Sequence, residues 1–190
     1  MVGSDIVVGR TKDLTNRAES VKRGFAKYLD KERINEVIGG MRMGRERMLL
    51  TFLWMSGVRV SEAVSVCKQD LDFEQRLMSV KWLKSRKYLR RVVPIHSRLS
   101  GVLQVYVSRM REEERVFPVT RQRAFQITKR YLGCSPHQLR HSFAVNWLRG
   151  GGDLVVLHRV LGHAKIQTTM EYLKIVPIDQ AKALEKIEFW

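Results

Sequence analysis

Two side chains with phosphate-binding chemistry, His137 and Arg140, stand three residues apart at the start of a predicted helix. Ser135 is a suitable N-cap for this helix, and Pro136 is a suitable first helical residue. A helix N-terminus attracts anions, and a guanidinium adds paired hydrogen bonds to phosphate oxygens. The pair therefore predicts a phosphate site. The alternative is that both are ordinary surface residues of a basic protein.

A second pair, His163 and Tyr172, stands nine residues apart, and the tyrosine could supply a nucleophile. His163 follows a helix that a glycine ends, and the next helix is predicted to bury Ile166, Met170 and Leu173. At roughly 100° per residue, Tyr172 falls away from this apolar face, so we expect its phenol to point outward and to be available as a nucleophile. The alternative is an amphipathic tyrosine at the edge of a core.

Basic residues also gather in a predicted β-hairpin. Another arginine, Arg59, lies in a glycine turn three residues before Glu62. Residues 76–91 contain no acidic side chain and seven basic ones, namely Arg76, Lys81, Lys84, Arg86, Lys87, Arg90 and Arg91. Such a surface suits DNA phosphates or a DNA groove. A solvated edge that discourages strand pairing between molecules is the alternative.

The composition indicates a polyanionic partner. The 190 residues include 35 lysines and arginines against 19 acidic residues, a formal charge of +16 that is spread over both halves of the sequence. This argues against a small acidic substrate and against a basic tail on a neutral domain. No apolar run reaches the roughly 18 residues of a membrane span, so we expect no membrane association. Cys67 and Cys134 are expected in the core and favour a cytoplasmic protein.

Apolar spacing and glycine or proline breaks predict the elements that position these residues. A short helix runs from Asp30 to Gly39-Gly40, a buried helix covers 45–56 and stops at Gly57, and a helical turn covers 60–66. Strands over 77–83 and 89–95 flank a loop over 84–88, with a third strand within 70–73. Further helices are predicted at 97–111, 121–132, 136–149, 153–161, 165–174 and 178–188. The fold class is mainly α with a small antiparallel β-sheet (α+β).

Three segments are expected along the chain. Residues 1–28 form a basic lead-in or linker, residues 29–176 form the domain that carries the site, and residues 177–190 form a C-terminal helix. The apolar stripe of that last helix predicts docking in a groove, either on a neighbouring subunit or on its own domain.

The order and spacing of these motifs resemble one known family. The motifs are Gly57-Val58-Arg59-Val60-Ser61-Glu62, the basic hairpin ending Val92-Val93-Pro94, His137-x-x-Arg140, Leu161-Gly162-His163 and Tyr172. Together they are similar to the catalytic domain of the tyrosine recombinase (phage integrase) family over about residues 29–176.

The resemblance implies a role for each matched residue. Arg59 and Arg140 would clamp the scissile phosphate, His137 and His163 would assist by hydrogen bonding and proton transfer, and Tyr172 would be the nucleophile. A hairpin lysine would protonate the leaving 5′-oxygen. Strand phase favours Lys84 for this role, with Lys87 second, although the spacing from Pro94 places Arg86 there. The remaining hairpin residues expected to bind DNA are Lys81, Arg86, Lys87, Arg90 and Arg91.

The resulting hypothesis is a site-specific DNA recombinase (integrase) that works through a covalent 3′-phosphotyrosyl intermediate. The alternatives are a type IB topoisomerase-like nicking and rejoining enzyme and a non-catalytic DNA-binding protein. Neither a metal ion nor another cofactor is expected, because the arginines can stabilise the phosphate charge. The resemblance also implies double-stranded DNA as partner and a tetramer on DNA built by exchange of the C-terminal segment, with weak association or a monomer when DNA is absent.

Overall fold

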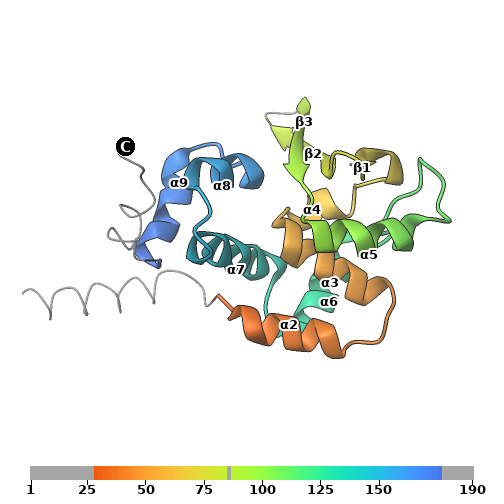
Figure 1. Cartoon of the computed structure of the whole chain (residues 1–190), viewed down its shortest axis with the longest axis horizontal. Helices are drawn as coiled ribbons and strands as arrows, with labels where there is room; N and C mark the ends of the chain where they lie inside the picture. Colours follow the sequence, from red (N-terminus) through yellow and green to blue (C-terminus); the bar gives the residue numbers. More distant parts are fainter. Residues whose placement is uncertain (1–27, 85–86, 177–190) are drawn as a thin grey trace, which may run out of the picture.

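The computed structural model describes residues 28–84 and 87–176, with only the backbone placed for residues 82–84, 87 and 88. Figure 1 shows helices gathered around α3 (Arg45–Ser56), a β-hairpin at one edge, and α7 (Pro136–Arg149) joining this part to the last helices. The class is the predicted one, mainly helical with a three-stranded antiparallel sheet.

Helix α3 forms the centre of the main core because apolar side chains surround it on nearly all sides. Its buried apolar residues are Met48, Leu49, Leu50, Phe52, Leu53 and Trp54. It packs against α7, α2 (Lys31–Gly40), α5 (Ser97–Val107) and α6 (Arg121–Leu132). The predicted bounds of α3, α6 and α7 are confirmed, whereas α5 ends at Val107, earlier than predicted.

The sheet holds β1 (Leu71–Asp72), β2 (Leu77–Lys84) and β3 (Lys87–Pro94) in that order, and both pairings are antiparallel. The register pairs Lys84 with Lys87. Strand pairing therefore extends into the predicted loop over 84–88. Helix α4 (Val60–Ala63) and the 3₁₀ turn η1 (Lys68–Asp70) connect α3 to this sheet.

A second, smaller apolar cluster fixes the last elements to α7. These elements are α8 (Leu154–Leu161), α9 (Ile166–Met170) and the 3₁₀ turn η2 (Glu171–Lys174). The buried members of the cluster are Ala144, Val145, Leu157, Leu161, Tyr172 and Val176. The cluster therefore places the predicted nucleophile inside the protein.

The predicted helix over 165–174 is interrupted, and its buried face differs from the expected one. Helix α9 ends at Met170, which is 47% exposed, and η2 follows. Thr169, Tyr172 and Val176 are buried instead of Ile166, Met170 and Leu173. A 3₁₀ turn repeats every three residues, so Tyr172 lies on the same side as Thr169 and faces inward. The expectation of an outward phenol is wrong for this reason.

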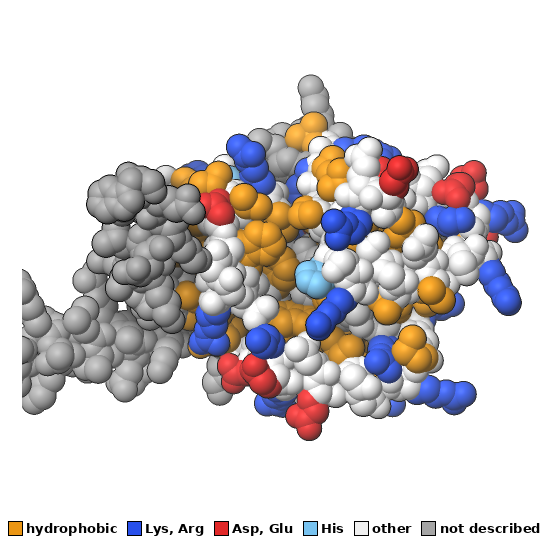
Figure 2. Space-filling model, in the orientation of Figure 1, with side chains coloured by type: hydrophobic (Ala, Val, Ile, Leu, Met, Phe, Trp, Pro, Cys, Tyr) orange, Lys and Arg blue, Asp and Glu red, His pale blue; other side chains and the backbone are white. Residues whose placement is uncertain are grey.

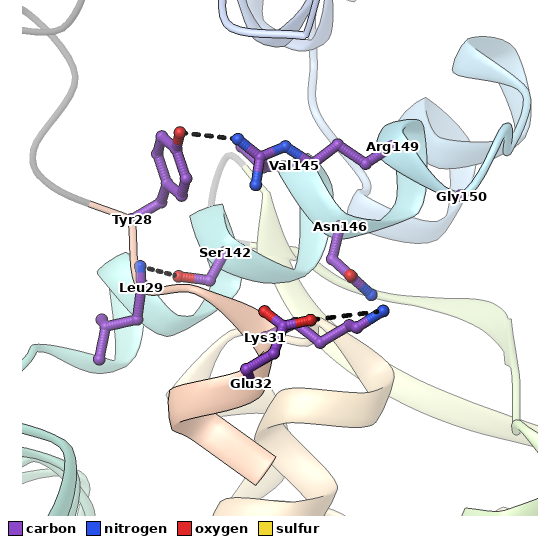
Figure 3. A pocket seen from close by; sticks show the side chains of 9 residues that line it. All are labelled: Tyr28, Leu29, Lys31, Glu32, Ser142, Val145, Asn146, Arg149 and Gly150. Atoms are coloured by element: carbon purple, nitrogen blue, oxygen red, sulfur yellow. Dashed lines mark hydrogen bonds and ion pairs between the residues drawn. The ribbon is translucent and has the colours of Figure 1, made fainter. Parts of the chain in front are cut away.

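The first described residues are attached to α7. The backbone N–H of Leu29 donates to Ser142 Oγ at 2.8 Å, and Arg149 donates to the Tyr28 hydroxyl at 2.8 Å. Figure 3 shows these contacts and the Lys31–Glu32 ion pair among the residues that line a pocket of about 260 Å³. None of the residues predicted to do chemistry lines it.

Two further predictions concern segments and membranes. The expected lead-in up to residue 27 and the expected helix over 178–188 lie outside the described residues. Within the described part of the chain, no helix combines the length and apolar character needed to cross a membrane.

Gly57 ends α3 in the left-handed conformation (φ +62°), and a Cβ there would overlap the ring of Phe143. We expect Gly57→Ala to lower the free energy of unfolding by roughly 2–5 kcal/mol, from backbone strain and overpacking together. Gly133→Ala is the matched control, because Gly133 has φ +68° with nothing within 4 Å of an added Cβ. It should lose only about 1–2 kcal/mol. Urea denaturation followed by tryptophan fluorescence measures both, and equal losses would contradict the steric argument.

Candidate active site

Two predicted site residues meet at the end of α8. Arg59, the N-cap residue of α4, donates to the carbonyl oxygens of Leu161 and Gly162 at 3.4 and 3.2 Å. Arg140 of α7 donates to the same Leu161 oxygen at 2.5 Å and to the Gly57 oxygen at 2.8 Å. The fold thus brings both guanidinium groups to one short backbone segment, immediately before His163.

The buried carboxylate of Glu62 orients Arg59. It accepts hydrogen bonds from the Arg59 backbone N–H at 2.7 Å and from the Arg59 guanidinium at 3.1 Å. Arg91 donates to both of its oxygens, at 2.6 and 3.0 Å. Burial alone would raise the pKa of Glu62, but the hydrogen bonds and charges of Arg91 and Arg59 outweigh it and hold that pKa below its ordinary value.

Arg91 was predicted among the DNA-binding residues of the hairpin, and in the structure its guanidinium is bound to Glu62. Its side chain is 11% exposed and also donates to the Val160 carbonyl oxygen. The register explains this position, because Arg91 pairs with the fully buried Val80 and shares its inward-facing side of the sheet. Arg91 ties β3 to α4 and α8, and so supports the position of Arg59.

Arg140 is 3% exposed, and burial lowers its pKa to about 9, with the nearby Arg59 charge acting in the same direction. It still carries its charge at neutral pH. Among the described residues, three guanidinium groups therefore face one carboxylate at this site. The excess of positive charge favours an anion close to Arg59, the more exposed of the three at 38%.

Tyr172 lies beside this cluster with its hydroxyl engaged. The residue is 1% exposed, and its hydroxyl oxygen is 2.6 Å from Nδ1 of His141. Burial raises the pKa of Tyr172 to about 12, and the Arg140 charge opposes this shift. The phenol is therefore protonated at neutral pH in this state, and an imidazole nitrogen is within hydrogen-bond distance of it.

His141 is the residue that the sequence interpretation did not assign. It lies four residues after His137, on the same side of α7, and the two ring centres are 4.1 Å apart. That spacing was the available signal. Burial lowers the pKa of His141 to about 4, with His137 and Arg140 contributing, so its ring is neutral at neutral pH. His137 is more exposed than His141. Partial burial of its ring, together with the charges of Arg140 and Arg59, also lowers the pKa of His137.

His163 also lies beside the Tyr172 ring. The two rings are stacked, with centres 6.4 Å apart and planes inclined by 15°. Its Nδ1 is 2.9 Å from the Thr169 hydroxyl. Burial lowers the pKa of His163 to about 4, and the charges of Arg140 and Arg59 contribute. His163 is therefore a neutral ring that is stacked on the tyrosine and lies within the field of both arginines.

The hairpin residues predicted to contact DNA are placed only in part. Lys81 is exposed. Arg90 is half-exposed and bonded to Asp70 at 2.8 Å and to Ser79 at 3.1 Å. For Lys84 and Lys87 the structure describes the backbone, and Arg86 lies outside the described residues. In the part of the chain that is described, no group of three acidic, histidine or cysteine side chains could hold a metal ion.

The arrangement of the chain matches known DNA recombinases. It is similar to the crystal structure of XerA recombinase (TM-score 0.68, 22% identity, 87% of this chain and 65% of that one). It is also similar to the catalytic domain of bacteriophage HP1 integrase (TM-score 0.66, 21% identity, 85% of this chain and 95% of that one). A third similar structure is XerH site-specific recombinase bound to its difH substrate (TM-score 0.63, 19% identity, 86% of this chain and 53% of that one). The fold is that of a tyrosine recombinase catalytic domain.

Sequence comparison gives the family. The pattern of the phage integrase family matches residues 27–177. Tyrosine recombinases XerA of Thermococcus kodakarensis and Pyrococcus horikoshii are 31% and 28% identical, over 93% and 91% of this chain and 70% and 67% of their own length. The chain belongs to the phage integrase family, and its class is that of the site-specific tyrosine recombinases, which cut and rejoin DNA strands. It spans about two thirds of the length of these relatives.

The Glu62 ion pairs make stability depend on pH. Because the pKa of Glu62 is lower in the folded state, its contribution is complete above the ordinary value of 4.5 and is lost as pH falls through the lower folded-state pKa. At neutral pH we expect Glu62→Gln to lower the free energy of unfolding by roughly 3–5 kcal/mol. The difference from wild type should narrow in acid, where Glu62 itself becomes neutral. Urea denaturation across this pH range measures it.

The matched control is Glu171→Gln, which removes an exposed ion pair with Lys174. That variant should change the free energy of unfolding by about 0–1 kcal/mol. A Glu62→Gln loss that is small at neutral pH, or that grows in acid, would contradict the role given to this carboxylate.

Proposed function

We propose that Arg59 and Arg140 bind the scissile phosphate of double-stranded DNA and that Tyr172 attacks it to form a 3′-phosphotyrosyl intermediate. The observation that carries this proposal is the convergence of the two guanidinium groups on Leu161 and Gly162, beside His163 and Tyr172. Preorganised positive charge in a partly buried site stabilises the charge that builds on the phosphate oxygens. His163 adds a hydrogen bond to one of these oxygens.

The covalent step conserves one phosphodiester bond. The Tyr172 oxygen forms a bond to phosphorus while the bond from phosphorus to the 5′-oxygen breaks. A lysine of the hairpin, Lys84 or in second place Lys87, gives a proton to that 5′-oxygen. The reverse attack by a DNA 5′-hydroxyl rejoins the strand and releases the tyrosine.

His141 is the proposed acceptor of the phenolic proton, in place of His137. The distance of 2.6 Å between its Nδ1 and the Tyr172 hydroxyl supports this assignment. In the resting site, burial and the positive charge of Arg140 keep His141 neutral. A bound phosphate brings negative charge, which offsets Arg140 and makes His141 a better proton acceptor. Nucleophile activation is thereby coupled to DNA binding.

Binding to the DNA backbone is assigned to exposed basic residues. Lys81, Arg86, Lys87 and Arg90 of the hairpin remain candidates, whereas Arg91 is engaged with Glu62. The overall charge of +16 supports contacts with several phosphates, so affinity should depend on salt. The XerH neighbour, solved with its DNA substrate, has the same fold.

Recombination between two sites needs several active sites, so we propose a tetramer on DNA formed by exchange of residues 177–190. That segment lies outside the described residues. A type IB topoisomerase-like activity uses the same chemistry on a single duplex. Strand exchange between two labelled duplexes distinguishes the two activities, because a topoisomerase-like enzyme only reseals the duplex that it has cut.

Tyr172→Phe should abolish covalent attachment to a nicked suicide duplex, because the attacking oxygen is removed while the ring still fills the cluster. Tyr106→Phe is the control, since Tyr106 packs against Phe117 in the main core and should leave attachment unchanged. Denaturing gel electrophoresis of labelled DNA detects the adduct. An adduct that persists in Tyr172→Phe, or that is absent from the wild type, would overturn the enzymatic proposal.

The acceptor role predicts that His141→Ala slows adduct formation by about 10²-fold or more, because proton transfer from the phenol is lost. Added imidazole should restore part of the rate, which a merely structural defect would not allow. His137→Ala is the comparison, since His137 is four residues away on the same helix. Imidazole rescue of His137→Ala without rescue of His141→Ala would reverse the assignment.

A further inference from the structure

A buried hydroxyl stands between two imidazole rings behind the proposed site. Thr169 of α9 is fully buried, and its Oγ1 is 2.9 Å from Nδ1 of His163 and 3.1 Å from Nδ1 of His158. His158 belongs to the last turn of α8, and His163 follows the end of that helix. The three side chains form a short hydrogen-bonded chain that links α8 to α9.

The number of available protons limits how these three side chains can hydrogen-bond to one another. A threonine hydroxyl has one proton to donate and two lone pairs to accept with. It can therefore donate to at most one of the two Nδ1 atoms. Among the described residues its proton has no other acceptor, so if both rings donated, this buried proton would be left without a hydrogen bond. Thr169 therefore donates to one ring, and the other ring donates its own Nδ1 proton to the Thr169 oxygen. When both rings are neutral, the two histidines have opposite tautomers.

The direction of the hydrogen bond between Thr169 and His163 determines which nitrogen of His163 carries a proton. In the described part of the chain, its single hydrogen bond is the one through Nδ1, so Nε2 is the nitrogen that remains for a ligand. A neutral ring that accepts at Nδ1 carries its proton on Nε2 and can donate to a phosphate oxygen. In the opposite arrangement, an Nε2 lone pair would face that oxygen. Because the pKa of His163 lies near 4, the ring is neutral and its tautomer matters.

We propose that Thr169 is a positioning residue that donates its proton to Nδ1 of His163 and that His158 donates its Nδ1 proton to Thr169. This inference rests on the proposed role of His163 as a hydrogen-bond donor to the phosphate. The three residues hold the Nε2–H tautomer of His163 in place before DNA arrives, as partners behind a reacting group commonly do.

The first test reads the tautomers directly in the 190-residue chain without DNA. A two-bond ¹⁵N–¹H correlation spectrum of histidine-labelled protein at neutral pH should show Nε2 protonated and Nδ1 unprotonated in His163. His158 should show a protonated Nδ1. A protonated Nδ1 in His163 would overturn the inference, whatever the protein does to DNA.

Two substitutions of His158, which introduce side chains of the same size, should reverse or preserve the direction of these hydrogen bonds. His158→Asp replaces the donor by an acceptor, so Thr169 should donate to it and His163 should change to the Nδ1–H tautomer. Adduct formation should then fall about a hundredfold, as for the loss of one transition-state hydrogen-bond donor. His158→Asn is the matched control, because its amide N–H₂ can still donate, and it should retain both the tautomer and most of the rate.

A second pair acts at the hydroxyl itself. Thr169→Val keeps the shape of the side chain and should give mixed tautomers in His163, whereas Thr169→Ser should resemble the wild type. An unchanged His163 tautomer in both His158→Asp and Thr169→Val would overturn the inference. If the wild type shows the expected tautomers but forms no adduct with the suicide duplex, the proposed function is wrong. The proposed hydrogen bonding of His158, Thr169 and His163 would still be correct.

Discussion

One carboxylate surrounded by guanidinium groups is the interaction on which the rest of the site depends. Glu62 is almost completely buried, yet it remains ionised because Arg59 and Arg91 both bind it. Removing a buried partner from such a group leaves an uncompensated charge, so α4, β3 and the end of α8 must keep their relative positions. The ion pairs therefore fix the geometry of the site as well as its charge.

The same cluster is incompletely neutralised, and this is the physical basis of the proposed phosphate site. Arg59 and Arg140 bond to carbonyl oxygens at the C-terminal end of α8, where the helix dipole is negative. Those weak acceptors satisfy the hydrogen bonds but leave the net positive charge of three arginines against one glutamate. Figure 2 shows lysines and arginines scattered over one face of the molecule, consistent with further contacts along a DNA backbone.

Burial has different consequences for the arginines of the site and for its tyrosine and histidines. Burial keeps Tyr172, His141 and His163 neutral in the structure described. In the proposed mechanism it also strengthens the attraction between the arginines and an incoming phosphate. A tyrosine with a pKa near 12 is a poor nucleophile at neutral pH, because almost none of it is ionised. In the mechanism proposed above, DNA binding supplies the charge that changes this balance.

The sequence by itself was sufficient for the helices with strong periodicity and clear caps and for the strand pair. It also singled out Arg59, Arg140, His163 and Tyr172, which the structure brings close together. Motif order and local spacing carry that information. Only the tertiary structure decided that Tyr172 faces inward, that Arg91 binds Glu62, and that His141 and Thr169 contact Tyr172 and His163. Each of these depends on partners distant in the chain: the cluster behind α7, the register of β3 against β2, and the packing of α9 on α8. Local periodicity does not specify such partners, because the free energy of burying a charge or a hydroxyl depends on what the fold places around it.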